Sequence, residues 1–346
     1  MPVTLHRRLL DWYDAHRREM PWRGHPDPYA VWVSEIMLQQ TQVDTVRGYF
    51  ARFIAAFPTL AALAAAPQQE VLKAWEGLGY YTRARNLQKA AQAVIERGGV
   101  LPQGVAEWAA LPGVGPYTAA AIASICFGAY APVVDGNVIR VFARFLGWPD
   151  DFRKPPVRLR LAAWLQPHIE ASKRPGDFNQ AMMDLGATLC APRAPACAVC
   201  PLRRECVARR EGRQDALPVK PAKKGVPTRV GVAVLVRDTA GRVLFTQRTD
   251  EGLLSGLWEL PNVTVEHSPT QRDALRALSQ QAGLTATRAR RHGMVTHAFS
   301  HFKLHLHVFA VPVFSGTLDL GRKPPVRFAT PAELPLTTAT RRALAR

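Results

Sequence analysis

The chain has 346 residues, of which 47% are hydrophobic and 21% are charged, values typical of soluble globular proteins. Its length suffices for two or three domains, and no apolar run reaches the ~18 residues that span a bilayer. The net charge of +18 and the pI of about 10.4 favour a polyanionic partner, nucleic acid above all, over a membrane surface, because the basic residues are spread along the chain.

The N-terminal segment is predicted to be an amphipathic helix. Residues 1–20, MPVTLHRRLLDWYDAHRREM, lack the apolar core of a signal peptide. The cytoplasm is therefore the expected compartment. We also expect a protein of bacterial type that associates with the nucleoid and acts as a monomer.

Helices are predicted from residue 1 to about residue 210. Apolar residues recur at helical spacing in VWVSEIMLQQ, TVRGYFARFIAAF, VLKAWEGLGYY, NLQKAAQAVIERG and FNQAMMDLGATL. Thr41 followed by Asp44 is typical of a capping box, so one helix is expected to end near Gln40 and another to begin. We expect this part of the chain to be all-α.

Glu35 stands out in the first of these strings because its neighbours are mostly apolar. Burial in such surroundings disfavours the charged form of a carboxyl group, so the pKa of Glu35 is expected to rise. A carboxylic acid that stays protonated near neutral pH can donate a proton in catalysis.

The string LPGVGPYTAAAIASI at residues 111–125 is typical of a helix–hairpin–helix. Gly113 and Gly115 permit a tight turn whose backbone amides point outward, directly before a helix N-terminus. Such a turn can bind a DNA phosphate without reading the bases, although a plain turn between two helices has the same outline. Cys126, which follows in an apolar helical run, is expected to be a core residue.

Asp135 in VVDGNVIRVFARFL is placed to cap the helix that begins there. A single aspartate at such a position is most often only a cap. It gains interest from Glu35, because a protonated carboxyl group beside an ionised one is the pair that cleaves glycosidic bonds. Both residues are therefore candidate catalytic groups.

Four of the five cysteines, Cys190, Cys197, Cys200 and Cys206, follow the spacing C-x6-C-x2-C-x5-C. Disulfides are not expected in a reducing compartment, so the cluster predicts a bound metal more than four unrelated buried cysteines. Structural zinc usually uses two separated CxxC pairs or histidines, and four thiolates on a compact loop can also hold an iron–sulfur cluster, so the spacing leaves both open. Because the loop is basic, we expect the metal to fold a DNA-binding surface instead of performing redox chemistry.

The pattern changes after residue 207. Residues 208–229 are basic, contain several prolines and lack periodicity, which predicts an interdomain linker. RVGVAVLVRD and GRVLFTQRT then alternate like the strands of a β-hairpin, and HFKLHLHVFAV alternates like a further strand. Between them, SPTQRDALRALSQQAGL predicts a helix with Ser268 as its N-cap and Gly283 at its end. The C-terminal domain is therefore expected to be α+β.

Residues 9–206 resemble the helix–hairpin–helix DNA glycosylases that carry a [4Fe–4S] cluster, and among them the adenine DNA glycosylases (MutY family). The matching strings are PWR, SEIMLQQTQV, GLGYYTRARNLQKA, LPGVGPYTA, VDGNVIRV, FNQAMMDLGA and the cysteine loop. The resemblance implies that the four cysteines hold a [4Fe–4S] cofactor. It also implies an iron–sulfur domain of residues 1–25 and 131–207 and a six-helix domain of residues 26–130.

The same resemblance implies a monofunctional enzyme that hydrolyses the N-glycosidic bond of adenine mispaired with 8-oxoguanine or guanine in duplex DNA. Related glycosylase/lyases carry a lysine after the hairpin, where this chain has Tyr117, and a phenol cannot form the Schiff base. Glu35 would protonate N7 of the flipped adenine, and the Asp135 carboxylate would stabilise positive charge on the sugar. Tyr117 would contribute its dipole, and Asn137 would help to orient the site.

Other residues match DNA contacts of the family. Arg18 and Trp22 match positions that line the adenine pocket, and Leu38 and Gln40 match residues inserted near the lesion. Tyr80 matches an intercalating aromatic residue, and the glycines of GLGYY favour a turn that exposes it. The alternatives are a surface arginine and two aromatic core residues.

Residues 230 to about 315 resemble, more weakly, a Nudix domain, and we assign the Nudix-like domain to residues 230–346. An active Nudix hydrolase binds magnesium through R-E-U-x-E-E-x-G-U, but Ala277, Gln280 and Gln281 stand where the three glutamates belong. This domain is therefore expected to recognise DNA without hydrolysing nucleotides.

HAFSHF at residues 297–302 matches the hairpin with which the family reads 8-oxoguanine. Ser300 would hydrogen-bond the lesion edge, where O8 and N7–H replace a bare N7, while Phe299 and His301 would shape the loop. An ordinary amphipathic strand tip is the alternative. Zinc binding by the nearby histidines is disfavoured, because no cysteine or carboxylate joins them.

Three other functions stay open at this point. They are a non-catalytic DNA-binding protein with a metal loop, a Nudix nucleotide hydrolase with a DNA tether, and a lyase-type glycosylase. The first is disfavoured by the contexts of Glu35 and Asp135, the second by the missing glutamates and the third by Tyr117.

Overall fold

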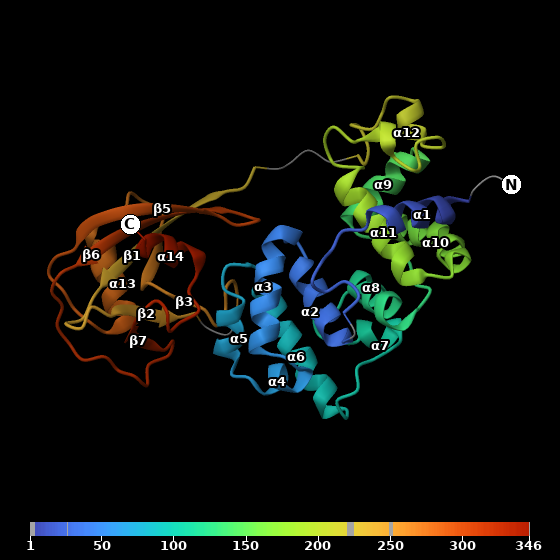
Figure 1. Ribbon diagram of the computed structural model, residues 1–346. Coiled ribbons are helices and arrows are strands. Elements are labelled where there is room, and N and C mark those ends of the chain that lie inside the picture. Colours follow the sequence, from blue (N-terminus) through green and yellow to red (C-terminus); the bar gives the residue numbers. More distant parts are fainter. Residues whose placement is uncertain (1–3, 26, 220–224, 249–251, 346) are drawn as a thin grey trace. The chain divides into compact units, whose positions relative to one another are not determined.

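The structure of the protein is a computed structural model that describes residues 4–25, 27–219, 225–248 and 252–345 (Figure 1). The chain divides into two compact units: Met1–Ala64 with Lys89–Ala222, and Ala65–Gln88 with Lys223–Arg346. The predicted linker lies partly outside the described residues. Its first part forms a short helix, α12 (Val207–Arg210), at the end of the range of about residues 1–210 that is predicted to be helical. The domain boundaries assigned from the sequence stay predictions.

The regular elements described in the first unit are all helical, as predicted. They are α1 (Leu5–His16), α2 (Pro28–Leu38), α3 (Val43–Ala56), α4 (Leu60–Ala65), the end of α6 (Thr82–Glu96), α7 (Val105–Ala109), α8 (Pro116–Phe127), α9 (Gly136–Leu146), α10 (Pro155–Ser172), α11 (Pro175–Thr188), the 3-10 turn η1 (Cys197–Val199) and α12. Among the described residues, no helix combines the length and the apolarity that a membrane crossing requires.

A hydrophobic core of the first unit lies among α1, α8, α9, α10 and α11. Its largest buried side chains include Leu9, Phe142, Leu165, Phe178 and Met182. Burial of one such side chain is worth about 1.5–3 kcal/mol relative to leaving it in water. This packing fixes the N-terminal ends of α8 and α9, where three of the predicted catalytic residues, Tyr117, Asp135 and Asn137, lie.

Helix α2 is buried on every side from Tyr29 to Met37. Its start is well defined, because Pro28 occupies the first turn and the Asp27 carboxylate accepts the Tyr29 amide at 2.8 Å. A helix that is apolar all round belongs in a core. Any polar side chain in its middle, such as Glu35, is thereby withdrawn from water.

Helices α7 and α8 form the predicted helix–hairpin–helix. Gly113 has a φ of 76°, in the left-handed region that only glycine adopts without strain. Gly115 is the N-cap of α8, Pro116 follows in its first turn, and Gly128 ends the helix. Gly113 and Gly115 are both exposed, so the turn presents its backbone to solvent.

Two predicted helix caps are wrong. The N-cap of α3 is Gln42 and not Thr41, because Gln40 adopts a φ of 58° and ends the preceding turn. The N-cap of α13 (Gln271–Ala282) is Thr270 and not Ser268. Thr270 forms a reciprocal capping box with Asp273, whose carboxylate accepts the Thr270 amide at 3.0 Å.

The prediction that Cys126 is a core residue is also wrong. Its side chain is only half-buried, and it lines a cavity together with charged residues. It lies near the C-terminal end of α8, where the apolar run of the sequence continues but the surrounding packing does not.

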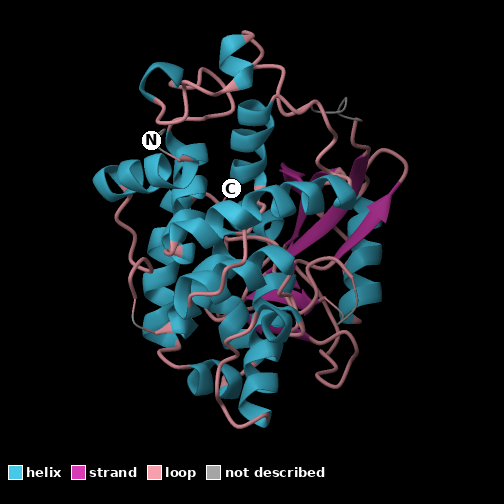
Figure 2. Cartoon of the chain, turned by 90° about the vertical axis from the view of Figure 1, so that its right-hand side faces the viewer, coloured by secondary structure: helices cyan, strands magenta, loops and turns pink. Residues whose placement is uncertain are grey.

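The second unit is α+β, as predicted (Figure 2, strands in magenta). Its elements are α5 (Gln68–Ala74), the start of α6, β1 (Thr228–Val236), β2 (Val243–Gln247), β3 (Trp258–Glu259), β4 (Asn262–Val265), α13, β5 (Arg290–Ala298), β6 (Lys303–Val311), β7 (Val326–Ala329) and α14 (Thr338–Leu344). One sheet has the order β4-β1-β6-β5, with β1 and β6 parallel, and the other has the order β3-β2-β7.

The predicted hairpin of the first two strands is wrong, because β1 and β2 belong to different sheets and share only the bridge Arg237–Val243. Strand β1 is buried on both faces: Val232 and Val234 enter the core beside α13, whereas Ala233 and Leu235 enter the core beside α14. The antiparallel hairpin of this unit is formed by β5 and β6 instead. The apolar run of β1 therefore indicated a central strand with two covered faces.

Candidate active site and DNA-binding residues

Glu35 is the buried acid that the sequence predicted. Its side chain is 5% exposed, and its Oε2 accepts a hydrogen bond of 3.0 Å from the Tyr117 hydroxyl. Burial raises the pKa of Glu35 to about 7, because desolvation outweighs the opposing hydrogen bond from Tyr117. Glu35 can therefore exist as a neutral acid near neutral pH. The Tyr117 hydroxyl also lies 3.2 Å from the sulfur of Met183.

Asp135 is the N-cap of α9, as predicted. Its Oδ1 accepts the Val138 amide at 2.7 Å, and its Oδ2 accepts the side-chain amide of Asn137 at 2.9 Å. Burial raises the pKa of Asp135, and these hydrogen bonds oppose the rise. Asn137 therefore acts on Asp135, by stabilising its ionised form.

The two carboxyl groups share one site. The charge of Asp135 contributes to the raised pKa of Glu35, and burial together with both carboxylates raises the pKa of Tyr117 well above its usual value. Tyr117 therefore stays a neutral phenol between the two acids. Residues separated by a hundred positions in sequence converge because α8 packs against α2, and α11 packs against both α8 and α9.

An ion network that the sequence did not predict lies beside this pair. Asp184 is completely buried and accepts hydrogen bonds from Arg18 (Nη2, 2.6 Å) and Arg23 (Nη1, 2.7 Å). Arg23 also donates to Gln180 at 2.9 Å, and its charge lowers the pKa of Glu35. Arg23 belongs to the string PWR and Asp184 to FNQAMMDLGA, but no local pattern pairs them.

A cavity of about 540 Å³ opens beside the network. Arg18, Arg23, Gln180 and Cys126 are among its walls. Glu35 is not among the described residues that line the cavity, but two of the lining residues, Cys126 and Arg23, interact electrostatically with it. Trp22 is not among the described residues that line the cavity: this side chain is buried with its ring 5.3 Å from that of Phe50. The predicted contact of Trp22 with adenine stays a prediction.

Gly186 lets α11 approach the start of α9. A Cβ atom at this position would lie 2.6 Å from the Cβ of Asn137 and 3.0 Å from its Cα. We expect Gly186→Ala to shift Asn137 and Asp135, to lower the free energy of unfolding by about 1–3 kcal/mol and to slow base excision. Thermal melting and single-turnover excision measure the two effects. Gly48→Ala controls for the loss of a helical glycine, because this residue is exposed on α3 and an added Cβ meets only the end of the Arg52 side chain, at 3.4 Å.

The predicted DNA contacts of the first unit lie at element ends. Leu38 ends α2 and is partly buried, and Gln40 is exposed with a φ of 58°. Gly113 and Gly115 occupy the exposed turn of the helix–hairpin–helix. Exposed backbone and side chains at such turns are accessible to a DNA strand.

Tyr80 belongs to the second unit, in the turn formed by residues 77–81. Its side chain is 50% exposed, and its φ of 48° lies in the left-handed region. The guanidinium of Arg83 lies 5.6 Å from the centre of its ring. The prediction of exposure is confirmed, while intercalation stays a prediction.

The predicted lesion-reading residues occupy the tip of the β5–β6 hairpin, residues 299–302. The Phe299 amide donates to the Phe302 carbonyl at 2.8 Å, and the two rings stack at 4.5 Å. Ser300 and His301 are exposed at the end of the tip, with Ser300 Oγ 3.3 Å from His301 Nδ1. The aromatic pair thus fixes a loop that presents two polar side chains to a ligand.

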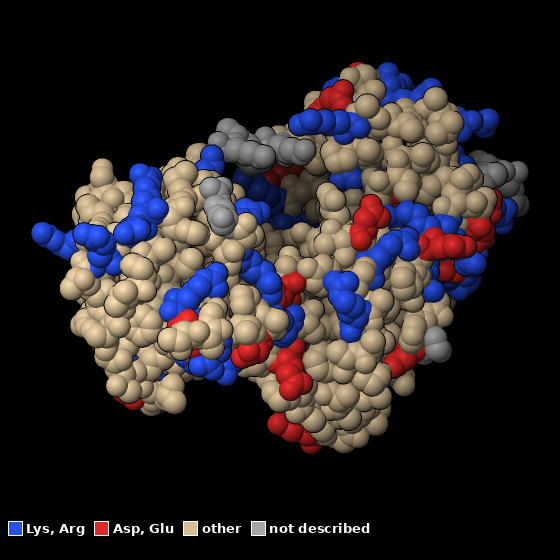
Figure 3. All heavy atoms as spheres, turned by 60° about the vertical axis from the view of Figure 1, so that its left-hand side comes forward, with Lys and Arg blue, Asp and Glu red and all other residues tan. Residues whose placement is uncertain are grey.

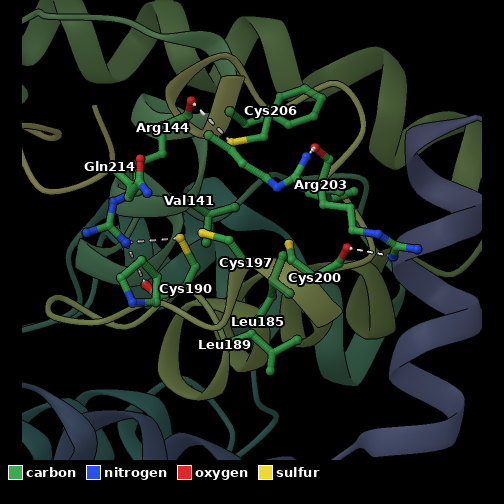
Figure 4. A pocket seen from close by; sticks show the side chains of 14 residues that line it. Val141, Arg144, Leu185, Leu189, Cys190, Cys197, Cys200, Arg203, Cys206 and Gln214 are labelled. Carbon is green, nitrogen blue, oxygen red and sulfur yellow. Dashed lines mark hydrogen bonds between the residues drawn. The ribbon is translucent and has the colours of Figure 1, made fainter. Parts of the chain in front are cut away.

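The four clustered cysteines line one cavity of about 30 Å³ (Figure 4). The walls between them are apolar and come from Val141, Phe145, Leu185, Leu189 and Leu202. Buried Arg144 donates to Cys190 Sγ at 3.3 Å and to the Ala191 carbonyl at 2.8 Å. Among the described residues, no three His, Cys, Asp or Glu side chains are close enough together to hold a single metal ion. Four thiols, apolar walls and a cationic donor to sulfur suit an iron–sulfur cluster chemically.

Helix α13 shows what replaces the Nudix glutamates. Ala277 is buried in the core, and Gln281 pairs with the backbone of Asn262, whose amide it accepts at 3.1 Å. Gln280 is exposed. Gln281 is thus committed to strand β4, a role for which a neutral amide suffices.

Comparisons with known proteins agree with this arrangement. The HhH-GPD superfamily of base excision DNA repair proteins matches residues 33–167, and the NUDIX domain family matches residues 232–346. The adenine DNA glycosylase of Homo sapiens is 39% identical over an alignment 383 residues long, which covers 94% of this chain and 70% of the human protein. The adenine DNA glycosylase of Buchnera aphidicola (Acyrthosiphon pisum) is 32% identical, covering 86% of this chain and 84% of its own length.

Solved structures match the helical part of the chain. A thermostable thymine-DNA glycosylase is 30% identical with a TM-score of 0.55, and the match covers 60% of this chain and 95% of that one. Endonuclease III in a non-covalent complex with DNA is 25% identical with a TM-score of 0.52, covering 60% and 94%. The fold and the relatives together show that the chain is a DNA glycosylase of base excision repair and belongs to the adenine DNA glycosylase family.

Proposed function

We propose that the enzyme hydrolyses the N-glycosidic bond of adenine mispaired with 8-oxoguanine or guanine in duplex DNA and leaves the strand uncut. The observation that carries this proposal is the pairing of a buried acid, Glu35, whose pKa is about 7, with Asp135 across Tyr117. Two carboxyl groups held in different protonation states are what glycosidic cleavage requires.

The chemistry follows from the protonation states. Adenine must leave the base stack to reach Glu35, which then protonates N7 and makes the base a better leaving group. The sugar develops positive charge as the bond breaks, and the Asp135 carboxylate stabilises that charge. Asn137 keeps Asp135 ionised by donating to its Oδ2 at 2.9 Å, and Tyr117 adds its hydroxyl dipole between the two groups.

The cavity of about 540 Å³ is the place that we assign to the extruded adenine. Arg18 is held there by Asp184 and offers donors to a base-edge acceptor, while the side-chain oxygen of Gln180 can accept a hydrogen bond from an amino group. The residue at the lysine position of the lyases is Tyr117, so this chain lacks at that point the amine that would form a Schiff base. Strand cleavage by such an intermediate is therefore not expected.

We further propose that Cys190, Cys197, Cys200 and Cys206 hold a [4Fe–4S] cluster. Support comes from the shared cavity, its apolar walls and the donor that Arg144 provides to Cys190. Such a cluster would cross-link a loop that carries Arg193, Arg203 and Arg204, so that the loop presents its positive charge to DNA.

DNA binding would be largely electrostatic. Lys and Arg side chains form several groups on the face shown in Figure 3, in keeping with the net charge of +18. The exposed glycine turn before α8 adds backbone amides for a phosphate. These contacts position the duplex and do not read its sequence.

One gel assay tests the proposal. The protein is incubated with duplex DNA containing adenine opposite 8-oxoguanine, and strand scission is compared with and without hot alkali. Scission only after alkali supports hydrolysis to an abasic site. Scission without alkali would show a lyase, and intact strands in both lanes would contradict a glycosylase acting on this mispair.

The tip of the β5–β6 hairpin is expected to supply the lesion preference. Ser300 and His301 are exposed there, and replacing both with alanine removes only the edge contact of the His301 ring with Phe302, so folding should stay intact. The ratio of the excision rates on A·8-oxoguanine and A·guanine should fall by about tenfold, the worth of one lost hydrogen bond to a polar edge. Single-turnover rates on the two duplexes measure this ratio. An unchanged ratio would exclude the hairpin from lesion recognition.

A further inference from the structure

Residues 65–88 come from the helical part of the sequence but belong to the same compact unit as the Nudix-like domain. The segment contains α5 and, directly after it, the turn of residues 77–81 that carries Tyr80, which we call the Tyr80 turn. The hairpin tip, residues 299–302, is part of the same unit. The contacts within this unit therefore decide how the two elements are held.

The carboxylate of Glu76 contacts three residues of the second unit, Leu336, Arg341 and Lys73, and its side chain is only 10% exposed. Its carboxylate accepts the backbone amide of Leu336 at 2.7 Å and both donor nitrogens of the Arg341 fork, and it lies 3.0 Å from the ammonium of Lys73. Lys73 in turn donates to the Leu334 carbonyl at 2.9 Å. One carboxylate thus joins the end of α5 to the segment that leads into α14.

Two more side chains of residues 65–88 bind the Nudix-like domain. Gln69 accepts the indole N–H of Trp258 at 2.9 Å and donates to the Gly256 carbonyl at 3.0 Å. Arg85, in the first turn of α6, donates to the Ser255 carbonyl at 2.7 Å. The Tyr80 turn is therefore held on both sides, by α5 before it and by α6 after it.

The contacts continue from α14 to the hairpin. Arg342, next to Arg341, donates to the Thr296 carbonyl on β5 at 3.2 Å, and α14 packs against β5. Strand β5 ends at Ala298, immediately before the hairpin tip. A continuous set of packed residues thus links Glu76 to the tip that carries Ser300.

The backbone of Glu76 directly precedes the other element. Its amide donates to the Lys73 carbonyl at 3.1 Å, and the next residue, Gly77, opens the Tyr80 turn with a φ of 100°. The turn itself is braced by Trp75, whose indole N–H donates to the Gly79 carbonyl at 3.2 Å. A displacement of Glu76 would therefore be passed directly to Tyr80.

We propose that Glu76 is a positioning residue that couples the Tyr80 turn to the lesion-reading hairpin tip, so that the base opposite adenine affects the rate at which adenine is extruded. The inference rests on the proposed function, because it assumes that both elements contact the mispair. Glu76 touches neither the DNA nor the reacting atoms; it fixes the spacing between two elements that do. A buried carboxylate with several charged and backbone donors holds such a spacing rigidly, because loss of one partner leaves the others uncompensated.

The test compares three full-length proteins: wild type, Glu76→Gln and the control Glu70→Gln, which changes an exposed glutamate of α5, the helix that precedes Glu76. Single-turnover excision is measured on duplexes with adenine opposite 8-oxoguanine and opposite guanine. Glu76→Gln is expected to lower the ratio of the two rates by about tenfold, with the rate on A·guanine changed by less than about threefold. Glu70→Gln should leave both rates unchanged.

A double-mutant cycle separates coupling from a general loss of structure. If Glu76 acts through the hairpin tip, adding Glu76→Gln to the Ser300→Ala/His301→Ala protein should change the rate ratio by less than about twofold. If Glu76→Gln does not fold, Arg341→Lys, which keeps the charge but removes the second donor of the fork, is used in the same cycle with the same expectation.

The outcomes distinguish the two claims. The coupling is overturned if Glu76→Gln keeps the wild-type ratio of the two rates, or if the combined variant lowers the ratio by the product of the two separate effects. The proposed function would then still stand. Equal wild-type rates on the two duplexes would overturn the proposed lesion preference and the coupling with it. A fall in the ratio that disappears in the combined variant supports both.

Discussion

Glu35→Gln is expected to lower the single-turnover rate of base excision by about 10²–10⁴-fold, while binding to the mispaired duplex is retained. Glutamine has the shape of glutamate and can still accept the hydrogen bond of the Tyr117 hydroxyl, but it has no proton to give to adenine. Rapid-quench excision and a gel-shift titration measure the two properties. Glu96→Gln, at the exposed end of α6, serves as the control.

The pH dependence of the wild-type enzyme gives an independent check of the same assignment. Glu35 acts as an acid only when protonated, and its pKa is about 7, so the excision rate should fall about tenfold per pH unit above that value. At the low end, the rate should fall when Asp135 becomes protonated. A rate that stayed constant from pH 6 to pH 9 would rule out Glu35 as the proton donor.

Stability measurements show whether Glu35→Gln loses activity because the protein unfolds. Folding raises the pKa of Glu35 from its usual value of about 4.5 to about 7, because burial disfavours the charged form, so the native state binds the proton more tightly than the unfolded chain. The free energy of unfolding therefore falls as the pH rises from about 4.5 to 7. Glutamine does not ionise, so the variant should melt no earlier than the wild type at pH 8, and lost activity could not be attributed to unfolding.

The parts of this site that the sequence predicted correctly are those set by local interactions. Asp135 caps α9 through an amide three residues ahead, a contact within one turn of chain. Glu35 is buried because the residues around it in α2 are mostly apolar, which is visible in a single helix. Gly113 is required by its own φ of 76°. In each case the deciding interaction lies within a few residues.

The parts that the sequence did not predict depend on distant segments. Asp184 meets Arg18 and Arg23 across more than 150 residues, and nothing in either string indicates the pairing. Strand β1 was assigned to a hairpin with its neighbour in sequence, whereas its parallel partner is β6, about 75 positions away. The contacts that join residues 65–88 to the C-terminal unit likewise come from segments far apart in the sequence.

Thr41 shows that even a local pattern can be overridden. Its spacing to Asp44 is that of a capping box. The chain nevertheless turns at Gln40 through a left-handed conformation, so that Gln42 is the N-cap and α3 begins at Val43. Gln40 is one of the residues matched to DNA insertion. A strained backbone at such a position is consistent with a functional constraint that competes with helix capping.

Asp135→Asn is the second substitution with a large expected effect, because it separates the structural role of this residue from its chemical role. Asparagine caps a helix about as well as aspartate and can still accept the Val138 amide, but its Nδ2 is a donor and cannot accept the side-chain amide of Asn137. The free energy of unfolding should therefore fall by up to about 1 kcal/mol. Asparagine carries no charge to stabilise the developing cation on the sugar. The excision rate should therefore fall by about 10²–10³-fold or more.

Asp135→Ala completes the comparison. Alanine removes both the charge and the cap, so this variant should lose activity to a similar extent and also lose about 1 kcal/mol of stability. If Asp135 were only a cap, the order would be reversed: the asparagine protein would keep its excision rate within about tenfold of wild type and only the alanine protein would be impaired. Both variants change the same side chain. Their single-turnover rates and melting curves therefore decide whether the carboxylate stabilises the transition state or only caps α9.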